Sequence, residues 1–283
     1  MIASFERAAR RPAGGALRRV RQAVALGCAV LSLQTGAAHA AALQVTPIRL
    51  DLAADRPAAV LTLHNVGTTP LNAQVRVFAW SQTADEDHLE RTDKIVASPP
   101  IVQVAPGADQ TVRILRAGKG DVSGEETYRL LIDEIPNNQG ADATGVRMQL
   151  RYSVPVFVGA PLDGKPPALQ FALERMGADA LAQTSAASSV QAGGLMLRAV
   201  NRDATHAQLS KVKLTWHDGQ STLLTPGLLG YALPHATRRW PVANAPADAR
   251  EATLSAVVNG QPVTARVRVE SDAAAPAVST PAR

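Results

Sequence analysis

Cysteine is almost absent from this chain of 283 residues. The single cysteine, Cys28, lies in an apolar stretch, Ala23–Leu33, inside a segment that we expect to be removed on export. A lipoprotein signal that retains Cys28 is the less favoured alternative, because few apolar residues precede it. If the segment is removed with Cys28, the mature chain has neither a disulfide nor a thiol nucleophile. Its stability must come from hydrophobic cores, for which about 240 residues are enough.

Aromatic residues and catalytic motifs are also scarce. Aromatic side chains make up only 4% of the sequence, which argues against a stacking platform for sugars or nucleic acids. The sequence has no Gly-x-Ser-x-Gly elbow, no phosphate-binding loop and no His-Glu-x-x-His pair. The histidines after the first forty residues are scattered singly, and each is interpreted as a surface or structural residue: His64, His88, His206, His217 and His235. The sequence therefore predicts no catalytic residue, no metal ligand and no cofactor.

Two further features have structural interpretations. The acidic stretch "DEDHLE", Asp85–Glu90, could attract a cation, but a solvated hairpin tip is the favoured interpretation. The three tryptophans lie in strand-like surroundings and are expected in hydrophobic cores: Trp80, Trp216 and Trp240. Neither feature indicates an enzyme.

The net charge of +5 comes from the first forty residues. These contain six arginines and one glutamate, and without them the acidic and basic residues balance. The basic isoelectric point therefore gives no reason to expect nucleic acid as a partner. The arginine-rich start, the short apolar stretch and the small residues Ala38-His39-Ala40 are typical of a cleavable secretory signal. The apolar stretch is shorter than the roughly 20 residues that a membrane-spanning helix needs.

From Ala42 onward, strand-like segments recur about every ten residues, and no long amphipathic helix stands out. This pattern predicts an all-β chain of β-sandwiches. The first half contains seven such segments, the count of an immunoglobulin-like domain: 42–52, 58–67, 70–80, 93–100, 109–116, 127–136 and 146–158. A hinge rich in Pro and Gly follows at 159–167, and a second set of strands comes after it. The predicted organisation is a signal at 1–40, a first domain at 41–160, a second domain at 161–270 and a disordered tail at 271–283.

The seventh segment, "VRMQLRYSVPVFV", carries an unusually large apolar ridge. By the two-residue period of a strand, one face holds Val146, Met148, Leu150, Tyr152, Val154 and Val156. A central strand buried between two sheets would account for this ridge without any function. The alternative is a sheet edge that another chain completes. Pro155 favours the edge, because proline cannot donate to a ladder and is normally confined to edges and bulges.

Two longer motifs resemble a known family. "ASPPIVQVAPGADQTVRIL" at 97–115 and "YRLLIDEIP" at 128–136 are similar to segments of the periplasmic chaperones of chaperone/usher pilus assembly. The signal, the seven strands, the hinge and the second sandwich follow the same order. The resemblance implies two immunoglobulin-like domains in a boomerang arrangement. It also implies a periplasmic protein that binds, folds and caps pilus subunits by donor-strand complementation and delivers them to an outer-membrane usher.

The resemblance also implies roles for particular residues. Val146, Met148 and Leu150 would be inserted into the groove of the subunit, with Tyr152 continuing the row. Arg49 corresponds to the cleft arginine that holds the C-terminal carboxylate of the subunit, although it could also be an ordinary surface arginine. No cofactor, nucleic acid or small-molecule substrate is implied.

This sequence departs from the best-known members of the family. Pro155 stands where they have a lysine, and Gly159 stands where an arginine follows. "RYSVPVFV" and "GLLGYALPHATRRWPV" resemble the divergent branch called archaic. The second cation of the carboxylate anchor must then come from elsewhere, and Arg129 and Arg151 are equal candidates, with Arg113 a weaker one.

The sequence fits two other classes of protein less well. A secreted structural or adhesive fibre component is the main alternative, but the mature chain would begin almost directly in a strand and has a second domain. A carbohydrate-active enzyme would need a pair of carboxylates in a cleft, and no motif indicates one.

Overall fold

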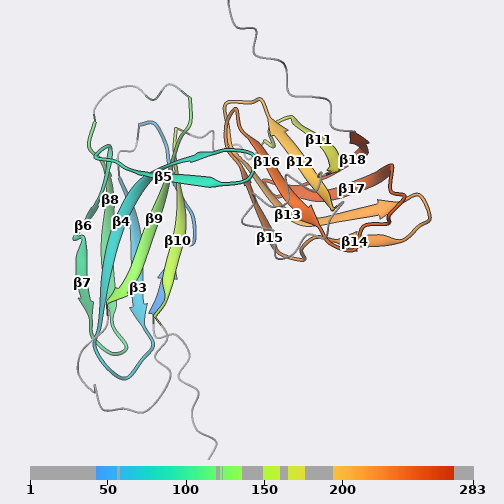
Figure 1. Cartoon of the computed structure of the whole chain (residues 1–283). Coiled ribbons are helices and arrows are strands. Elements are labelled where there is room, and N and C mark those ends of the chain that lie inside the picture. The colour runs from blue at the N-terminus through green and yellow to red at the C-terminus, as the bar shows by residue number, and fades with distance from the viewer. Residues whose placement is uncertain are drawn as a thin grey trace, which may run out of the picture. The chain divides into compact units, whose positions relative to one another are not determined.

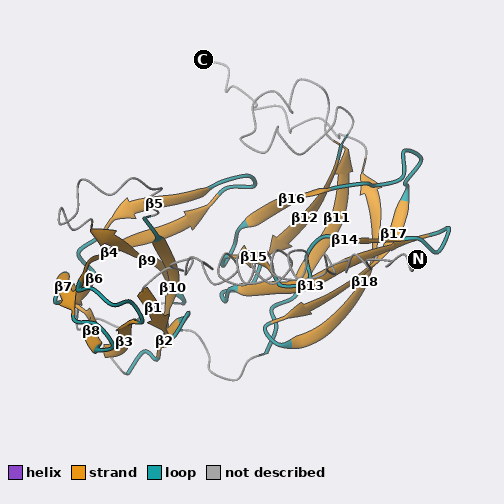
Figure 2. Cartoon of the chain, turned by 90° about the horizontal axis from the view of Figure 1, so that it is seen from below, coloured by secondary structure: helices purple, strands orange, loops and turns teal. Residues whose placement is uncertain are grey.

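The computed structural model describes residues 43–55, 58–118, 122, 124–135, 149–159, 165–175 and 194–270. Every regular element in this part of the chain is a β-strand, so the predicted all-β class is confirmed (Figures 1 and 2). The predicted signal, the predicted tail, Val146 and Met148 lie outside the described residues. In the described ranges no helix is long and apolar enough to cross a membrane.

The first sandwich consists of two sheets. One has the strand order β1-β3-β8-β6, formed by β1 (Leu43–Thr46), β3 (Ala58–Asn65), β8 (Asp109–Arg116) and β6 (Ile95–Ser98). The other has the order β2-β10-β9-β4-β5, and β7 also pairs with β4; its strands are β2 (Leu50–Leu52), β10 (Arg151–Val158), β9 (Glu126–Ile135), β4 (Leu71–Gln82), β5 (Asp87–Arg91) and β7 (Ile101–Val104). Alternating apolar side chains from both sheets pack into one core.

Prolines divide two of the expected strands. The segment predicted at 42–52 is interrupted at Pro47, so that β1 and β2 join different sheets. The segment predicted at 93–100 ends at Pro99 and Pro100, after which β7 begins in the other sheet. Proline has no N–H to give to a ladder, so the chain changes sheets at these points. With β5 added, the first sandwich has more strands than the seven that the sequence predicted.

The second sandwich has its own core, in which Trp216 and Trp240 are buried as expected. Its hydrogen-bonded order is β14-β13-β17-β18-β11-β12-β16, with β15 also pairing with β13. The strands are β11 (Leu169–Arg175), β12 (Leu195–Asn201), β13 (Ala207–Trp216), β14 (Ser221–Leu223), β15 (Leu228–Ala232), β16 (Thr237–Val242), β17 (Glu251–Val258) and β18 (Gln261–Glu270). The two short strands β14 and β15 were not expected from the sequence.

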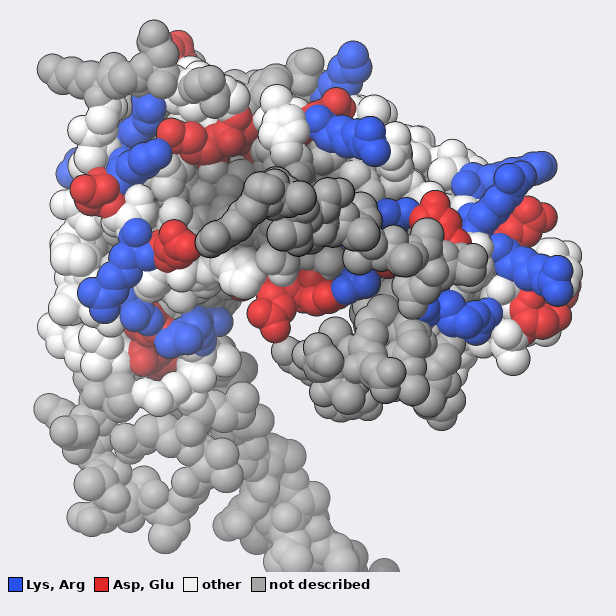
Figure 3. Space-filling model, turned by 45° about the horizontal axis from the view of Figure 1, so that its top comes forward, with Lys and Arg blue, Asp and Glu red and all other residues white. Residues whose placement is uncertain are grey.

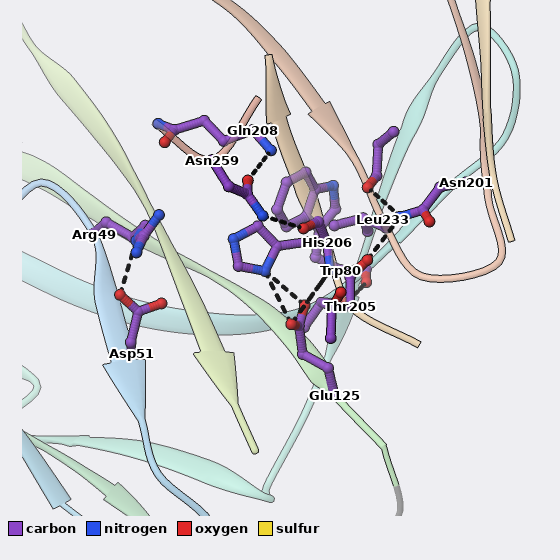
Figure 4. A network of polar contacts seen from close by, with 12 residues as sticks. Arg49, Asp51, Trp80, Glu125, Asn201, Thr205, His206, Gln208, Leu233 and Asn259 are labelled. Atoms are coloured by element: carbon purple, nitrogen blue, oxygen red, sulfur yellow. Dashed lines mark hydrogen bonds and ion pairs between the residues drawn. The ribbon is translucent and has the colours of Figure 1, made fainter. Parts of the chain in front are cut away.

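A buried asparagine closes an equivalent turn in each sandwich. Asn65 donates its side-chain amide to the carbonyls of Thr69 and Val104. Asn201, which is drawn in Figure 4, donates to the carbonyls of Thr205 and Ala232. Each side-chain oxygen accepts from the backbone N–H two residues further on, which is an Asx turn. On the surface, acidic and basic side chains are intermixed (Figure 3), in keeping with the balanced charge after the first forty residues.

Candidate functional site

The two halves of β10 have different neighbours. β9 pairs with β10 along its whole length, from Arg151 to Val158. β2 pairs with the other side of β10 only at Val156–Val158, in a parallel register that matches Leu50 with Val156. No described strand pairs with that side between Arg151 and Pro155. Among the described strands, the end of β10 is therefore central in the sheet and its beginning is an edge. Completion of that edge by another chain stays a prediction.

Two backbone hydrogen bonds show which groups point to this open edge. Gly159 donates its N–H to Leu52 O on the β2 side (2.9 Å), whereas Leu150 O accepts from Glu134 N on the β9 side (3.2 Å). Because backbone groups alternate in direction along a strand, those of Arg151, Ser153 and Pro155 point to the open edge. Pro155 is the last position before β2 begins, so its missing N–H removes no hydrogen bond from the sheet.

The apolar ridge is divided in the same way. Val154, Val156 and Val158 are buried in the core of the first sandwich. Tyr152 packs against the same core, and its hydroxyl donates to Leu43 O. Leu150 is half-buried and is not part of this core. The side chains that the protein uses for its own core therefore begin at Tyr152, and Leu150 is the first described ridge residue outside it.

The opposite face of the same sheet carries two of the candidate arginines. Arg49 immediately precedes Leu50, whose partner is Val156, so Arg49 lies beside Pro155. Arg129 is the antiparallel partner of Pro155 on β9. With strands about 4.8 Å apart, the backbones of the two arginines lie about 10 Å apart with Pro155 between them. Arginine side chains are long enough to reach a common anion across that distance.

Arg49 has part of its guanidinium available. Its Nε donates to Asp51 Oδ2 at 2.8 Å (Figure 4), and its side chain is 37% exposed. Its terminal nitrogens have no hydrogen-bond partner among the described residues. Asp51 thus orients the guanidinium of Arg49 through Nε. The two terminal nitrogens remain available, and their geometry suits a carboxylate.

Arg129 lies over an aromatic ring. Its guanidinium carbon is 3.6 Å from the centre of the Trp80 ring, and Asp87 lies at 4.0 Å. Arg238 on β16 approaches the same aspartate at 3.8 Å. Burial lowers the pKa of Arg129, although the charge of Asp87 opposes that effect. Two arginines share one carboxylate here, so an additional anion would be favourable.

Arg151 and Arg113 lie elsewhere. Arg151 bonds Asp133, which also holds Arg76 at 2.5 Å. Burial alone would raise the pKa of Asp133, but the hydrogen bonds from both arginines outweigh it and lower that pKa. Arg151 precedes Pro155 by four residues, about 13 Å along the strand. Arg113 is exposed on β8, in the other sheet.

Sequence reasoning missed an aromatic cluster that joins the two sandwiches. Trp80 and Phe157 of the first sandwich pack with Tyr231 and Leu233 of the second, so Trp80 is buried, but outside both main cores. The ring of His206 stacks on Phe157 with 3.5 Å between centroids. Phe157 is the sequence signal that could have indicated this contact. It places a large apolar side chain on the face of β10 opposite the ridge, where a second packing partner is needed.

Polar groups surround this cluster. The side chain of Glu125 is fully buried and accepts from the backbone N–H of His206 at 3.1 Å; it also bonds His206 Nδ1 at 2.9 Å (Figure 4). His206 is therefore a structural histidine, as the sequence suggested. Its other ring nitrogen, Nε2, is buried and has no partner within the described residues.

The acidic stretch does form a hairpin, but its tip is not simply solvated. Arg239 donates its Nε to Asp85 Oδ1 at 2.9 Å and its backbone N–H to Ala84 O at 2.7 Å. The tip is thus bound to β16 of the second sandwich. No group of three or more potential ligands for a metal ion occurs among the described residues.

Comparisons with known proteins agree with this architecture. Residues 42–161 match the family model described as "Pili and flagellar-assembly chaperone, PapD N-terminal domain". A search of curated proteins found no match. Among solved structures, the chain is similar to one from the CsuC-CsuE chaperone-tip adhesion subunit complex of archaic Csu pili of Acinetobacter baumannii, with 21% identity, coverage of 81% of this chain and 100% of that one, and a TM-score of 0.58.

Two further structures show the same fold. The YadV chaperone has 16% identity, coverage of 80% and 100%, and a TM-score of 0.54. A complex of the Salmonella enterica SafA pilin with the SafB chaperone has 15% identity, coverage of 79% and 95%, and a TM-score of 0.51.

The family match spans the first sandwich with β10, so this part of the chain resembles the N-terminal domain of a pilus-assembly chaperone, as the sequence motifs predicted. The solved structures share the fold of two β-sandwiches.

Proposed function

We propose that this chain binds pilus subunits through the open edge of β10 and acts in the periplasm, where it folds and caps them before delivery to an outer-membrane usher. The observation that carries this proposal is the absence of a described partner strand beside Arg151–Pro155. An unpaired edge is normally a liability that proteins protect. Here it adjoins Leu150, a half-buried apolar residue outside the core.

A subunit strand parallel to β10 would fit this edge. β2 already runs parallel to β10 and occupies the edge from Val156 onward. A strand with the same direction could pair with Arg151 and Ser153 and would have to end where β2 begins, beside Arg49. Its backbone would gain hydrogen bonds, while Val146, Met148 and Leu150 entered the groove of the subunit. Each buried side chain would contribute about 1.5–3 kcal/mol.

The same geometry suggests a carboxylate anchor. A subunit strand that ends beside Pro155 would place its C-terminal carboxylate between Arg49 and Arg129. Of the two equal candidates for the second cation, Arg129 is favoured, because it is the register partner of Pro155. Arg151 is bonded to Asp133 further along the strand.

Ser153→Pro tests the open edge directly. The substitution removes an N–H that points to the edge and leaves the ladder with β9 intact, so it should weaken the complex with a co-expressed subunit from the same operon at least about tenfold. Ser153→Ala, which keeps the N–H, is the matched control. Periplasmic pull-down and isothermal titration measure the complex, and thermal unfolding checks the fold. A folded Ser153→Pro protein with unchanged affinity would refute pairing along this edge.

Arg49→Ala tests the anchor. Loss of charge-assisted hydrogen bonds worth about 1.5–3 kcal/mol should weaken subunit binding by about 10- to 100-fold. Arg113→Ala removes an exposed arginine from the other sheet and should leave binding unchanged. Equal affinities for the two variants in titration would show that Arg49 is an ordinary surface residue.

A further inference from the structure

Tyr231 of the second sandwich contacts Arg129 and lies close enough to Arg49 to be affected by its charge. Its ring packs edge-on to Trp80 at 5.6 Å, and the guanidinium of Arg129 lies on that same tryptophan. It also packs on Phe157 at 5.7 Å, and Phe157 is the register partner of Asp51, which holds Arg49. Tyr231 is thus linked through these contacts to Arg129 on one side of Pro155 and to Arg49 on the other.

The hydroxyl of Tyr231 has a proton to donate. Gln208 donates its Nε2 to the phenolic oxygen at 3.1 Å. A phenol carries one donor and can also accept, and the O–H of Tyr231 has no acceptor among the described residues. Gln208 therefore holds the Tyr231 hydroxyl in place, and the hydroxyl proton remains available for another acceptor.

The charges around this hydroxyl are mainly positive. Burial raises the pKa of Tyr231 most, whereas the charges of Arg129 and Arg49 and the hydrogen bond from Gln208 lower it. Among the neighbouring charges, only that of Asp51 raises the pKa of Tyr231. A buried O–H donor close to two arginines is suited to an anionic acceptor.

We propose that the Tyr231 hydroxyl is a third donor to the C-terminal carboxylate of the bound subunit, beside Arg49 and Arg129. This inference rests on the proposed function and adds a binding residue from the second sandwich to it. A carboxylate has about four acceptor sites, enough for both guanidinium groups and one hydroxyl. A neutral donor would also compensate in part for the lysine that Pro155 replaces.

The test compares Tyr231→Phe with Tyr128→Phe. The first removes the hydroxyl proposed to meet the carboxylate, and the second removes a tyrosine hydroxyl that donates to Glu126 within the first sandwich. The probes are two synthetic peptides of the last strand of the operon's own pilus subunit, one with a free C-terminal carboxylate and one with a C-terminal amide. Affinities are measured by isothermal titration with the full mature chain.

Tyr231→Phe should weaken binding of the carboxylate peptide by about tenfold, the usual effect of one hydrogen bond to a charged group. It should leave binding of the amide peptide unchanged, and Tyr128→Phe should bind both peptides nearly as the unmodified protein does. Unchanged binding in Tyr231→Phe would overturn the proposal, as would an equal loss with the amide or an equal loss in Tyr128→Phe. If Arg49→Ala weakens binding and Tyr231→Phe does not, the proposed function stands and only this inference fails.

Discussion

Met148→Asp combined with Leu150→Asp should abolish the complex with a pilus subunit. If these side chains enter an apolar groove, each substitution forces a carboxylate out of water without a partner, which costs several kcal/mol. The combined loss should exceed about a thousandfold in affinity. Co-expression with the subunit and periplasmic pull-down would then recover no one-to-one complex.

The matched control is Gln149→Asp. By strand alternation this residue lies on the face opposite the ridge, so the same charge one position away should leave binding nearly unchanged. Because Leu150 is outside the core, the double variant should unfold at nearly the temperature of the unmodified protein. A folded double variant that still binds the subunit would contradict donor-strand complementation by this segment.

The sequence predicted the strands well because their cores require apolar residues at every second position. Leu61 and Leu63 on β3, and Val112 and Ile114 on β8, are all buried as that period demands. It predicted sheet membership less well. The changes of sheet at Pro47 and at Pro99 depend on which strands are neighbours, and a local period of two carries no such information.

The candidate site was predicted only in part for the same reason. Arg129 and Arg151 could not be ranked from strand order, whereas the register places Arg129 opposite Pro155 and Arg151 opposite Asp133. No sequence pattern indicates Tyr231, since it comes from the second sandwich and lies 102 positions after Arg129 in the sequence, so that only the tertiary contact relates the two. The face on which a residue lies could be predicted from a single strand, but contacts between strands could not.

His206→Ala should destabilise the chain by about 1–3 kcal/mol, the usual cost of removing one hydrogen-bond partner from a buried polar group. The carboxylate of Glu125 is fully buried and has His206 as its bonding partner, through both the ring and the backbone. The substitution also removes the ring that stacks on Phe157 of β10. Urea unfolding followed by tryptophan fluorescence measures the effect, and Trp80 lies in the same cluster.

Two further variants separate the buried charge from lost packing. Adding Glu125→Gln to His206→Ala replaces the carboxylate with a neutral amide that can still accept the backbone N–H, so part of the stability should return. His64→Ala removes a surface histidine paired with the exposed Asp109 and should cost no more than about 1 kcal/mol. If the double variant is no more stable than His206→Ala alone, the cost lies in the packing on Phe157 and not in the charge of Glu125. If the pair does carry the stability, then a buried hydrogen-bonded pair between the sandwiches holds the second sandwich, and Tyr231 with it, against the strand proposed to bind the subunit.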